Sequence, residues 1–243
     1  MLLFWILSTL GIGYSMLRLL FYRNWPFFFG EGLALSYGTG IAVVSLGMAF
    51  MSLFGMKFSV PSIMIWWVPF IAIALLINFK NPLSLRGAIA TKQSKKEIAS
   101  LTKRFARNDN ASLTLIEKFF IGIISFEVFY AFFRTLIKPM ESYDGIAIYA
   151  LKAKIFYLAK SIPHGFFKDF AYFVPHIEYP LLTPLAETYF YTFFGSLNDL
   201  LVKIIFPLYY AALLTISYSV SRRFLNRRVS LFFTFLLATI PQV

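Results

Sequence analysis

The side chains of this chain that are suited to chemistry are concentrated between positions 138 and 195. This segment mixes Asp, Glu, Lys, His and many Tyr with apolar residues, and very hydrophobic stretches flank it on both sides. A mixed segment held between membrane-spanning stretches is a natural place for chemistry on a membrane-embedded substrate. Its candidate residues are Asp144, Tyr149, Lys152, Lys154, His176, Glu178 and Tyr179.

The first half of this segment is predicted to form a helix over about residues 145–160. The side chain of Ser142 or of Asp144 can cap it by accepting hydrogen bonds from the first free backbone N–H groups. Apolar residues then recur at spacings of three and four, which is typical of an amphipathic helix. They are Ile148, Leu151, Ile155 and Leu158. We expect this helix to lie along a membrane surface.

The polar residues of the segment have a structural and a functional interpretation. Lys152, Lys154 and Lys160 are expected to point from the helix towards water or phosphate. Asp144 is either a simple cap or part of a site, because the N-terminus of a helix also favours an anion. His176 and Glu178 are either ordinary loop residues or site residues. The prolines nearby predict a turned, non-helical segment; they are Pro175, Pro180 and Pro184.

The composition is that of a membrane protein. Of the 243 residues, 59% are hydrophobic and only 14% are charged, and the mean hydropathy is +0.71. A soluble domain is about half apolar and about a quarter charged. Several stretches also reach roughly the 18 apolar residues that a bilayer span needs. The sequence therefore predicts an all-α integral membrane protein.

The formal net charge of +12 arises from cations in short loops beside these hydrophobic stretches. The positive-inside rule explains such a distribution, so we expect membrane lipids and no nucleic acid as partners. The chain has no Cys, which excludes disulfides, thiolate metal sites and cysteine nucleophiles. With only two His and no ligand spacing among the acids, we expect neither a metal site nor a cofactor.

The hydrophobic stretches predict a multi-spanning helical bundle. Residues 1–137 hold four spans, at about 2–21, 33–54, 63–79 and 113–136, with a basic loop at 80–112. Residues 138–195 form a partly helical first large outer loop, and residues 196–243 hold a fifth span at about 197–220 and part of a sixth. That last stretch, 229–243, would rise roughly 22 Å against a hydrocarbon core of about 30 Å. We therefore expect the chain to be the N-terminal part of a longer protein.

The charges predict which side of the membrane each loop faces. The basic loop 80–112 and a second basic cluster, Arg222, Arg223, Arg227 and Arg228, are expected in the cytoplasm. This topology places residues 138–195 on the outer face of the cell membrane. The second span is rich in small residues, which predicts close helix packing; they are Gly38, Gly40, Ser45 and Gly47. In the fourth span, Glu127 and Arg134 form either a structural ion pair or the lining of a site.

Two motifs of the outer segment resemble a known family. They are Asp144 with Tyr149-Ala-Leu-Lys152-Ala-Lys154, and His176-Ile-Glu178-Tyr179-Pro180-Leu-Leu-Thr-Pro184. They are similar to the first large outer loop of GT-C type glycosyltransferases that use polyprenyl-phosphate sugars. Among these, the family 39-like group, related to protein O-mannosyltransferases and aminoarabinose transferases, is the most similar. Glu31-x-x-Ala-Leu-Ser before the second span extends the resemblance upstream.

This resemblance implies an inverting transfer of a sugar from a polyprenyl-phosphate donor to a glycan, lipid or protein acceptor on the outer face. It implies that Asp144 is the general base, since a carboxylate can take the proton of the acceptor hydroxyl. Lys152 and Lys154 would balance the charge on the leaving phosphate. The remaining candidates would bind substrate; they are Tyr149, His176, Glu178 and Tyr179.

Two alternatives to the transferase stay open on the sequence. Asp144 and Glu178 are a carboxylate pair of the kind that glycosidases use, which suits a membrane hydrolase. A non-catalytic transporter or assembly subunit of an envelope polysaccharide pathway is favoured if Glu127 and Arg134 line a path through the membrane. A helix broken near mid-membrane would support transport, whereas an outer cavity beside the Asp144 helix would support the transferase.

Overall fold

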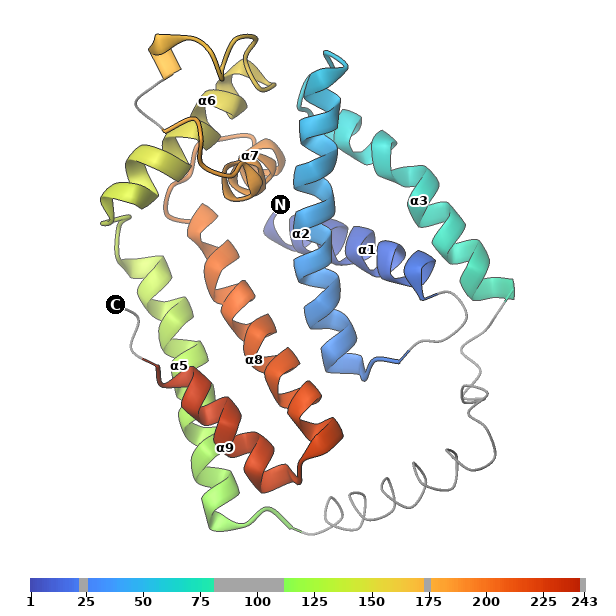
Figure 1. Ribbon diagram of the computed structural model, residues 1–243, viewed down its shortest axis with the longest axis vertical. Helices are drawn as coiled ribbons and strands as arrows, with labels where there is room; N and C mark the ends of the chain where they lie inside the picture. The colour runs from blue at the N-terminus through green and yellow to red at the C-terminus, as the bar shows by residue number, and fades with distance from the viewer. Residues whose placement is uncertain (22–25, 81–111, 173–175, 241–243) are drawn as a thin grey trace.

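The computed structural model describes residues 1–21, 26–80, 112–172 and 176–240, and within these ranges it contains helices and turns but no β-strand. The prediction of an all-α chain is confirmed for this part (Figure 1). Most of the predicted basic loop, residues 81–111, lies outside it, as do Pro175 and residues 241–243. The long helices are α1 (Leu2–Leu20), α2 (Phe29–Leu53), α3 (Val60–Lys80), α5 (Leu115–Ile137) and α8 (Ile205–Phe224). The shorter ones are η1 (Asp144–Ala150), α6 (Leu151–Ala159), η2 (Phe170–Tyr172), α7 (Leu182–Phe194), η3 (Val202–Ile204) and α9 (Arg227–Ala238).

Within the described ranges, four helical stretches are long and apolar enough to cross a membrane: α1, α2, α5 and the stretch Val202–Phe224, which joins η3 to α8. They coincide with the first, second, fourth and fifth predicted spans. A helix, α3, also forms at the third predicted span, and its segment Val60–Ile73 is apolar. At the position of the sixth, incomplete span predicted over 229–243, the chain forms α9, a 12-residue amphipathic helix that contacts α5 and α8.

Side-chain hydrogen bonds form a turn before the stretch Val202–Phe224 and cap the start of α5. The Asn198 carboxamide oxygen accepts hydrogen bonds from the backbone N–H groups of Leu200 and Leu201, at 3.2 and 2.9 Å. This turn keeps residues 198–201 out of the helix, so the predicted start at 197 was too early. At α5, the Thr114 hydroxyl accepts from the Glu117 backbone N–H while the Glu117 carboxylate accepts from the Thr114 backbone N–H. Such a reciprocal capping box fixes a helix start.

Helices α1 and α2 approach closely at two glycines. A methyl group added to Gly40 would collide with the backbone of Thr9, and one added to Gly13 would collide with the backbone of Ser36. Only a residue without a side chain allows this contact. The predicted packing role is thus confirmed for Gly40, but it is wrong for Gly38, which has no neighbouring atom within 4 Å of an added methyl.

Helix α7, although it belongs to the predicted outer loop, is part of the core. It is mostly buried and contacts α1, α2 and α6, between which it is seen almost end-on in Figure 1. The hydroxyl groups of Tyr189 and Ser8 are 2.6 Å apart, and the ring of Tyr189 packs beside that of Trp5. Pro184, expected outside any helix, lies in the first turn of α7, where the missing N–H costs no helical hydrogen bond.

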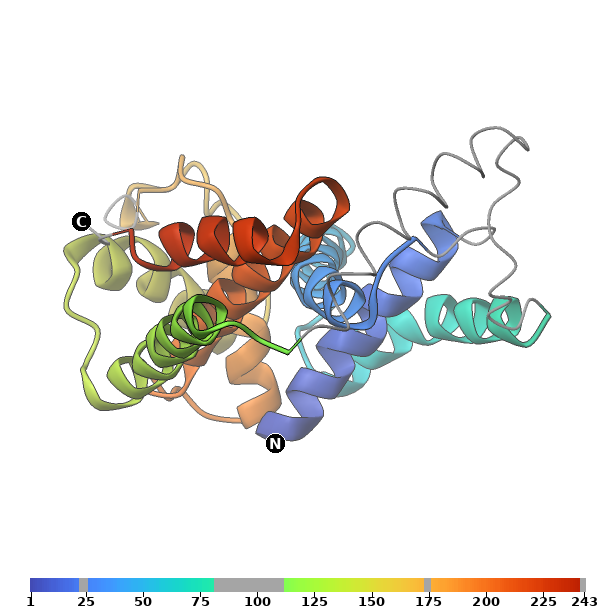
Figure 2. The same cartoon turned by 90° about the horizontal axis from the view of Figure 1, so that it is seen from below.

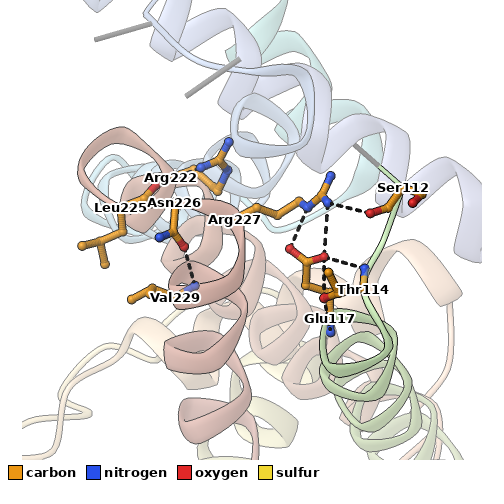
Figure 3. A network of polar contacts seen from close by, with 8 residues as sticks. All are labelled: Ser112, Thr114, Glu117, Arg222, Leu225, Asn226, Arg227 and Val229. Atoms are coloured by element: carbon orange, nitrogen blue, oxygen red, sulfur yellow. Dashed lines mark hydrogen bonds and ion pairs between the residues drawn. The ribbon is translucent and has the colours of Figure 1, made fainter. Parts of the chain in front are cut away.

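The two ends of the bundle differ in their polar groups. At one end, α9 follows α8 through a short turn (Figures 1 and 2). Arginines at this end pair with acids of other helices. Arg223 contacts the Glu31 carboxylate at 2.7 Å, and Arg227 contacts that of Glu117 at 3.0 Å. Figure 3 shows the second pair, where Arg227 also reaches the carbonyl oxygen of Ser112. Helices α6 and α7 lie at the opposite end, as the charge pattern predicts for the segment that carries Asp144.

Candidate functional site

A cavity of about 810 Å³ lies where the end of α5, the segment 138–145, helix α7 and the start of α8 meet. Its wall combines aromatic and apolar side chains with an unusual number of charged ones. The charged residues are Arg134, Lys138, Glu141, Asp144, Glu187 and Lys203. Concave sites that join an apolar wall with a few convergent polar groups are the usual binding sites for small molecules and cofactors.

Asp144 is placed at this cavity by the turn that follows α5. The Ser142 hydroxyl accepts a hydrogen bond from the backbone N–H of Gly145 at 3.0 Å, so Ser142 is the cap of the new helix. Asp144 is the first residue of η1, its side chain is exposed, and it lines the cavity. Helix η1 is π-helical, a geometry that is rare and concentrated at functional sites. Of the two residues that the sequence offered as the cap, Ser142 therefore has this role and Asp144 does not.

The basic side of the cavity comes from three separate elements. Arg134 lies in the last turn of α5, Lys138 follows its C-terminus, and Lys203 belongs to η3. The Lys203 ammonium donates a hydrogen bond to the backbone carbonyl of Lys138, which ties η3 to the end of α5. Of the two open interpretations of Arg134, the lining of a site agrees with its place in this wall.

Glu187 also lines this candidate site, although it was not among the residues predicted from the sequence. It lines the cavity from α7, yet its side chain is 1% exposed, and its Oε2 atom has no hydrogen-bond partner in the described structure. Burial, with the nearby negative charge of Asp199, raises its pKa to about 8, against a smaller opposite effect of Lys154. The signal in the sequence was a single acid within the aromatic run of residues 182–194, because such an acid is costly to bury without a reason.

Lys152 does not point towards water, and that prediction was wrong. Its side chain is fully buried, and its ammonium donates hydrogen bonds to the backbone carbonyls of His176 and Tyr179 at 2.6 and 3.2 Å. Burial lowers its pKa, while the charge of Glu178 acts in the opposite direction. The π-helical turn η1 holds more residues per turn than an α-helix, which rotates the faces of α6. Leu158, on the apolar stripe expected to face the membrane, is 69% exposed.

The other predicted binding residues form a second group around this lysine. The His176 ring nitrogen Nδ1 lies 3.0 Å from the Glu178 carboxylate, and the ring of Tyr179 packs edge-on against those of His176 and Tyr149. The backbone N–H of Glu178 and the His176 ring hold the pKa of Glu178 below its usual range. Of the residues predicted to bind substrate, Tyr149 lines the cavity with Asp144 and thus links the two groups.

Lys154 points to a third place. Its ammonium lies 2.6 Å from the carboxylate of Asp199, which also accepts a hydrogen bond from the hydroxyl of Tyr191 at 2.9 Å. Neither Lys152 nor Lys154 is among the residues that line the cavity. The structure thus brings Asp144 and Tyr149 together with three cations that the transferase resemblance had not assigned. Their roles in binding stay predictions.

No group of three or more His, Asp or Glu that could hold a metal ion is found in the part of the chain that the structure describes. A smaller cavity, of about 430 Å³, lies at the opposite end of the bundle beside Glu117, Arg227 and Arg228. Comparisons of this chain with models of protein families, with curated proteins and with solved structures found no match.

Proposed function

We propose that this chain is a membrane glycosyltransferase that moves a sugar from a polyprenyl-phosphate donor to an acceptor hydroxyl, with inversion and with Asp144 as the general base. One observation carries the proposal: Asp144 lines the same cavity as Arg134, Lys138 and Lys203. A carboxylate and a group of cations around one space match the two charges that develop in this reaction, a proton leaving the acceptor and a phosphate leaving the sugar.

The chemistry assigns different tasks to the two sides of the cavity. The acceptor oxygen forms a bond to the anomeric carbon while the bond from that carbon to the phosphate oxygen breaks. Asp144 takes the acceptor proton, and the cations stabilise the negative charge on the departing phosphate. We therefore assign to Arg134, Lys138 and Lys203 the role that the resemblance implies for Lys152 and Lys154. A single displacement of this kind inverts the anomeric centre.

The position of the cavity in the bundle suits a lipid-linked donor. Residues of α5 near its C-terminus and of α8 near its N-terminus form part of its wall, among them Ala131, Phe206 and Tyr210. We propose that these helices span the membrane and that this end faces outwards. A phosphate at the level of the lipid headgroups would then reach the cations while the polyprenyl chain stays among the lipids.

This cavity does not combine the features that would favour the transporter or the hydrolase. Helices α5 and α8 are continuous through their described length, which gives no support to the broken-helix transport mechanism. Glu178, the second acid of the hydrolase alternative, belongs to the group around Lys152 and is not part of the cavity wall. We therefore retain the transferase as the function that the geometry supports best.

The test uses membranes that contain the protein and a set of radiolabelled polyprenyl-phosphate sugars. We expect transfer by the wild type and a loss of at least about a hundredfold in Asp144→Asn, because general-base catalysis typically contributes that much or more. Asp169→Asn serves as the control, since it removes an exposed acid of the same outer segment that does not line the cavity. Full activity of Asp144→Asn would refute the assigned base, and no turnover of any donor would refute the transferase.

A further inference from the structure

Glu187 stands out among the buried groups because no hydrogen bond within the described ranges accounts for the placement of its Oε2 atom. It sits on α7 where the helix is enclosed by the core, and its side chain is almost fully buried. Its Oε2 atom has no hydrogen-bond partner in the described part of the chain. A buried polar atom of this kind normally has a partner. Since Glu187 also lines the cavity, a bound ligand can provide that partner.

The charges around the cavity indicate which kind of ligand fits. Three cations line it, and apart from Glu187 two carboxylates do, so a neutral Glu187 leaves one positive charge in excess. An ionised Glu187 would cancel that excess. The residues concerned are Arg134, Lys138, Lys203, Glu141 and Asp144. A cavity with a surplus positive charge and a neutral acid in its wall suits an anion, because the acid can then donate a hydrogen bond to it.

We propose that Glu187 is a ligand-binding residue of this cavity and that it donates a hydrogen bond to a phosphate oxygen of the lipid-linked sugar. This inference rests on the proposed function and deepens it, because it adds a contact to the phosphate that neither the sequence motifs nor the cations supply. The raised pKa of Glu187, about 8, agrees with a donor role at neutral pH. The side chain binds and orients the donor, whereas Asp144 takes the acceptor proton.

Two charged residues outside the cavity shift the pKa of Glu187 and provide matched controls. Asp199 raises its pKa through its negative charge, and Lys154, which pairs with Asp199 at 2.6 Å, lowers it. Asp199→Asn is therefore expected to shift the titration of Glu187 to lower pH, and Lys154→Met to shift it to higher pH. Neither residue is part of the cavity wall, so neither change removes a contact to the ligand.

The first measurement is independent of activity. Infrared spectra of the purified protein in detergent should show the carbonyl band of a protonated carboxylic acid at pH 6, which disappears with a midpoint near 8. The band should be absent in Glu187→Gln and shifted in its pH midpoint by Asp199→Asn and Lys154→Met. Absence of the band in the wild type at pH 6 would refute the donor role.

The second measurement adds a ligand. The probe is a short-chain polyprenyl-phosphate glucose, a phosphodiester with no second ionisation between pH 6 and 9. We expect binding of the probe to shift the infrared band of Glu187. We also expect the affinity of the wild type for the probe to fall about tenfold from pH 7 to pH 9, because the acid ionises over this range. Glu187→Gln keeps an N–H donor, so its affinity should not depend on pH. Glu187→Ala should bind at least about tenfold more weakly at pH 7.

The possible failures are distinguishable. If the probe binds the wild type and both Glu187 variants equally, with no change in the band, Glu187 is only a structural acid and the transferase proposal stands. If the wild type does not bind the probe while the band still titrates, the polyprenyl-phosphate donor is wrong, and the assigned ligand of Glu187 fails with it. Phosphatidylglycerol is the second probe; equal binding of it would assign the site to ordinary lipid headgroups and overturn the proposal.

Discussion

The buried ammonium of Lys152 lies 2.6 Å from the backbone carbonyl oxygen of His176, 24 positions along the chain. This hydrogen bond, with a second to the carbonyl of Tyr179, connects α6 to the segment that precedes α7. His176 has a positive φ of 51°, a conformation that side chains with a Cβ adopt rarely. The lysine therefore holds in place a turn that its local sequence does not favour.

The first prediction concerns Lys152→Met, which keeps most of the aliphatic volume but removes the donor. We expect the free energy of unfolding to fall by about 1–3 kcal/mol, because two buried carbonyl groups lose their partner. Thermal unfolding in detergent measures this change. Lys154→Met removes a partly exposed ion pair and should cost less than about 1 kcal/mol. If Lys152→Met left stability unchanged but abolished donor binding, the role in substrate binding implied by the resemblance would be correct.

The second prediction is a pH dependence of stability that originates in Glu187. Its pKa is raised from 4.5 to about 8 in the folded protein, so the folded state binds the proton more tightly than the unfolded state. This contribution is fully present below pH 4.5 and is lost as the pH rises towards 8, at about 1.4 kcal/mol per pH unit at most. The free energy of unfolding, measured between pH 5 and 8, should therefore decrease as the pH rises, and this decrease should be smaller in Glu187→Gln. An identical slope in both proteins would contradict the assignment.

The third prediction tests the contact between α1 and α2. Gly40→Ala places a methyl group against the backbone of Thr9 and should destabilise the protein by about 1–3 kcal/mol, as expected for overpacking. Gly38→Ala, two residues away on the same helix, meets no atom within 4 Å and should be neutral or slightly stabilising. Thermal unfolding of the two variants side by side measures the difference. Equal melting temperatures would show that the helices do not approach as closely as described.

The fourth prediction concerns the ion pair between Arg227 and Glu117 at the basic end of the bundle. The side chains are 15% and 5% exposed, and the carboxylate also accepts a hydrogen bond from Thr114 (Figure 3). Arg227→Gln leaves a nearly buried carboxylate without its cation and should cost about 3 kcal/mol. Arg228→Gln, an exposed neighbour that lines the same small cavity, should cost less than about 0.5 kcal/mol. A similar loss in both variants would mean that overall charge, not the pair, stabilises this end.

The fifth prediction tests the orientation in the membrane. The chain has no Cys, so a single introduced cysteine reports its own side. We expect Ser161→Cys, after α6, and Ser112→Cys, before α5, to react with a membrane-impermeant thiol reagent from opposite sides, with Ser161→Cys outside. The unmodified chain gives the background. Labelling of both positions from the same side would contradict the prediction that the cavity faces outwards.

The sequence by itself determined most of the long apolar helices, although it did not predict α7. Long apolar stretches form helices wherever they occur, because a helix satisfies its own backbone hydrogen bonds, and Thr114 with Glu117 shows a capping pattern that is readable from spacing alone. The separation of the arginine cluster from Asp144 also follows from charge pattern and span count. These features are local or periodic, so neighbouring residues suffice to predict them.

Only the tertiary structure decided which polar side chains share a space. Asp144, Glu187 and Lys203 come from three elements far apart in the chain and meet at one cavity, whereas Lys152, eight residues from Asp144, turns away to bind the carbonyls of a distant turn. The angular shift at η1 and the packing of α7 into the core produce this arrangement. Both depend on contacts between elements, since the burial of a charged group is favourable only where another part of the chain supplies its partner.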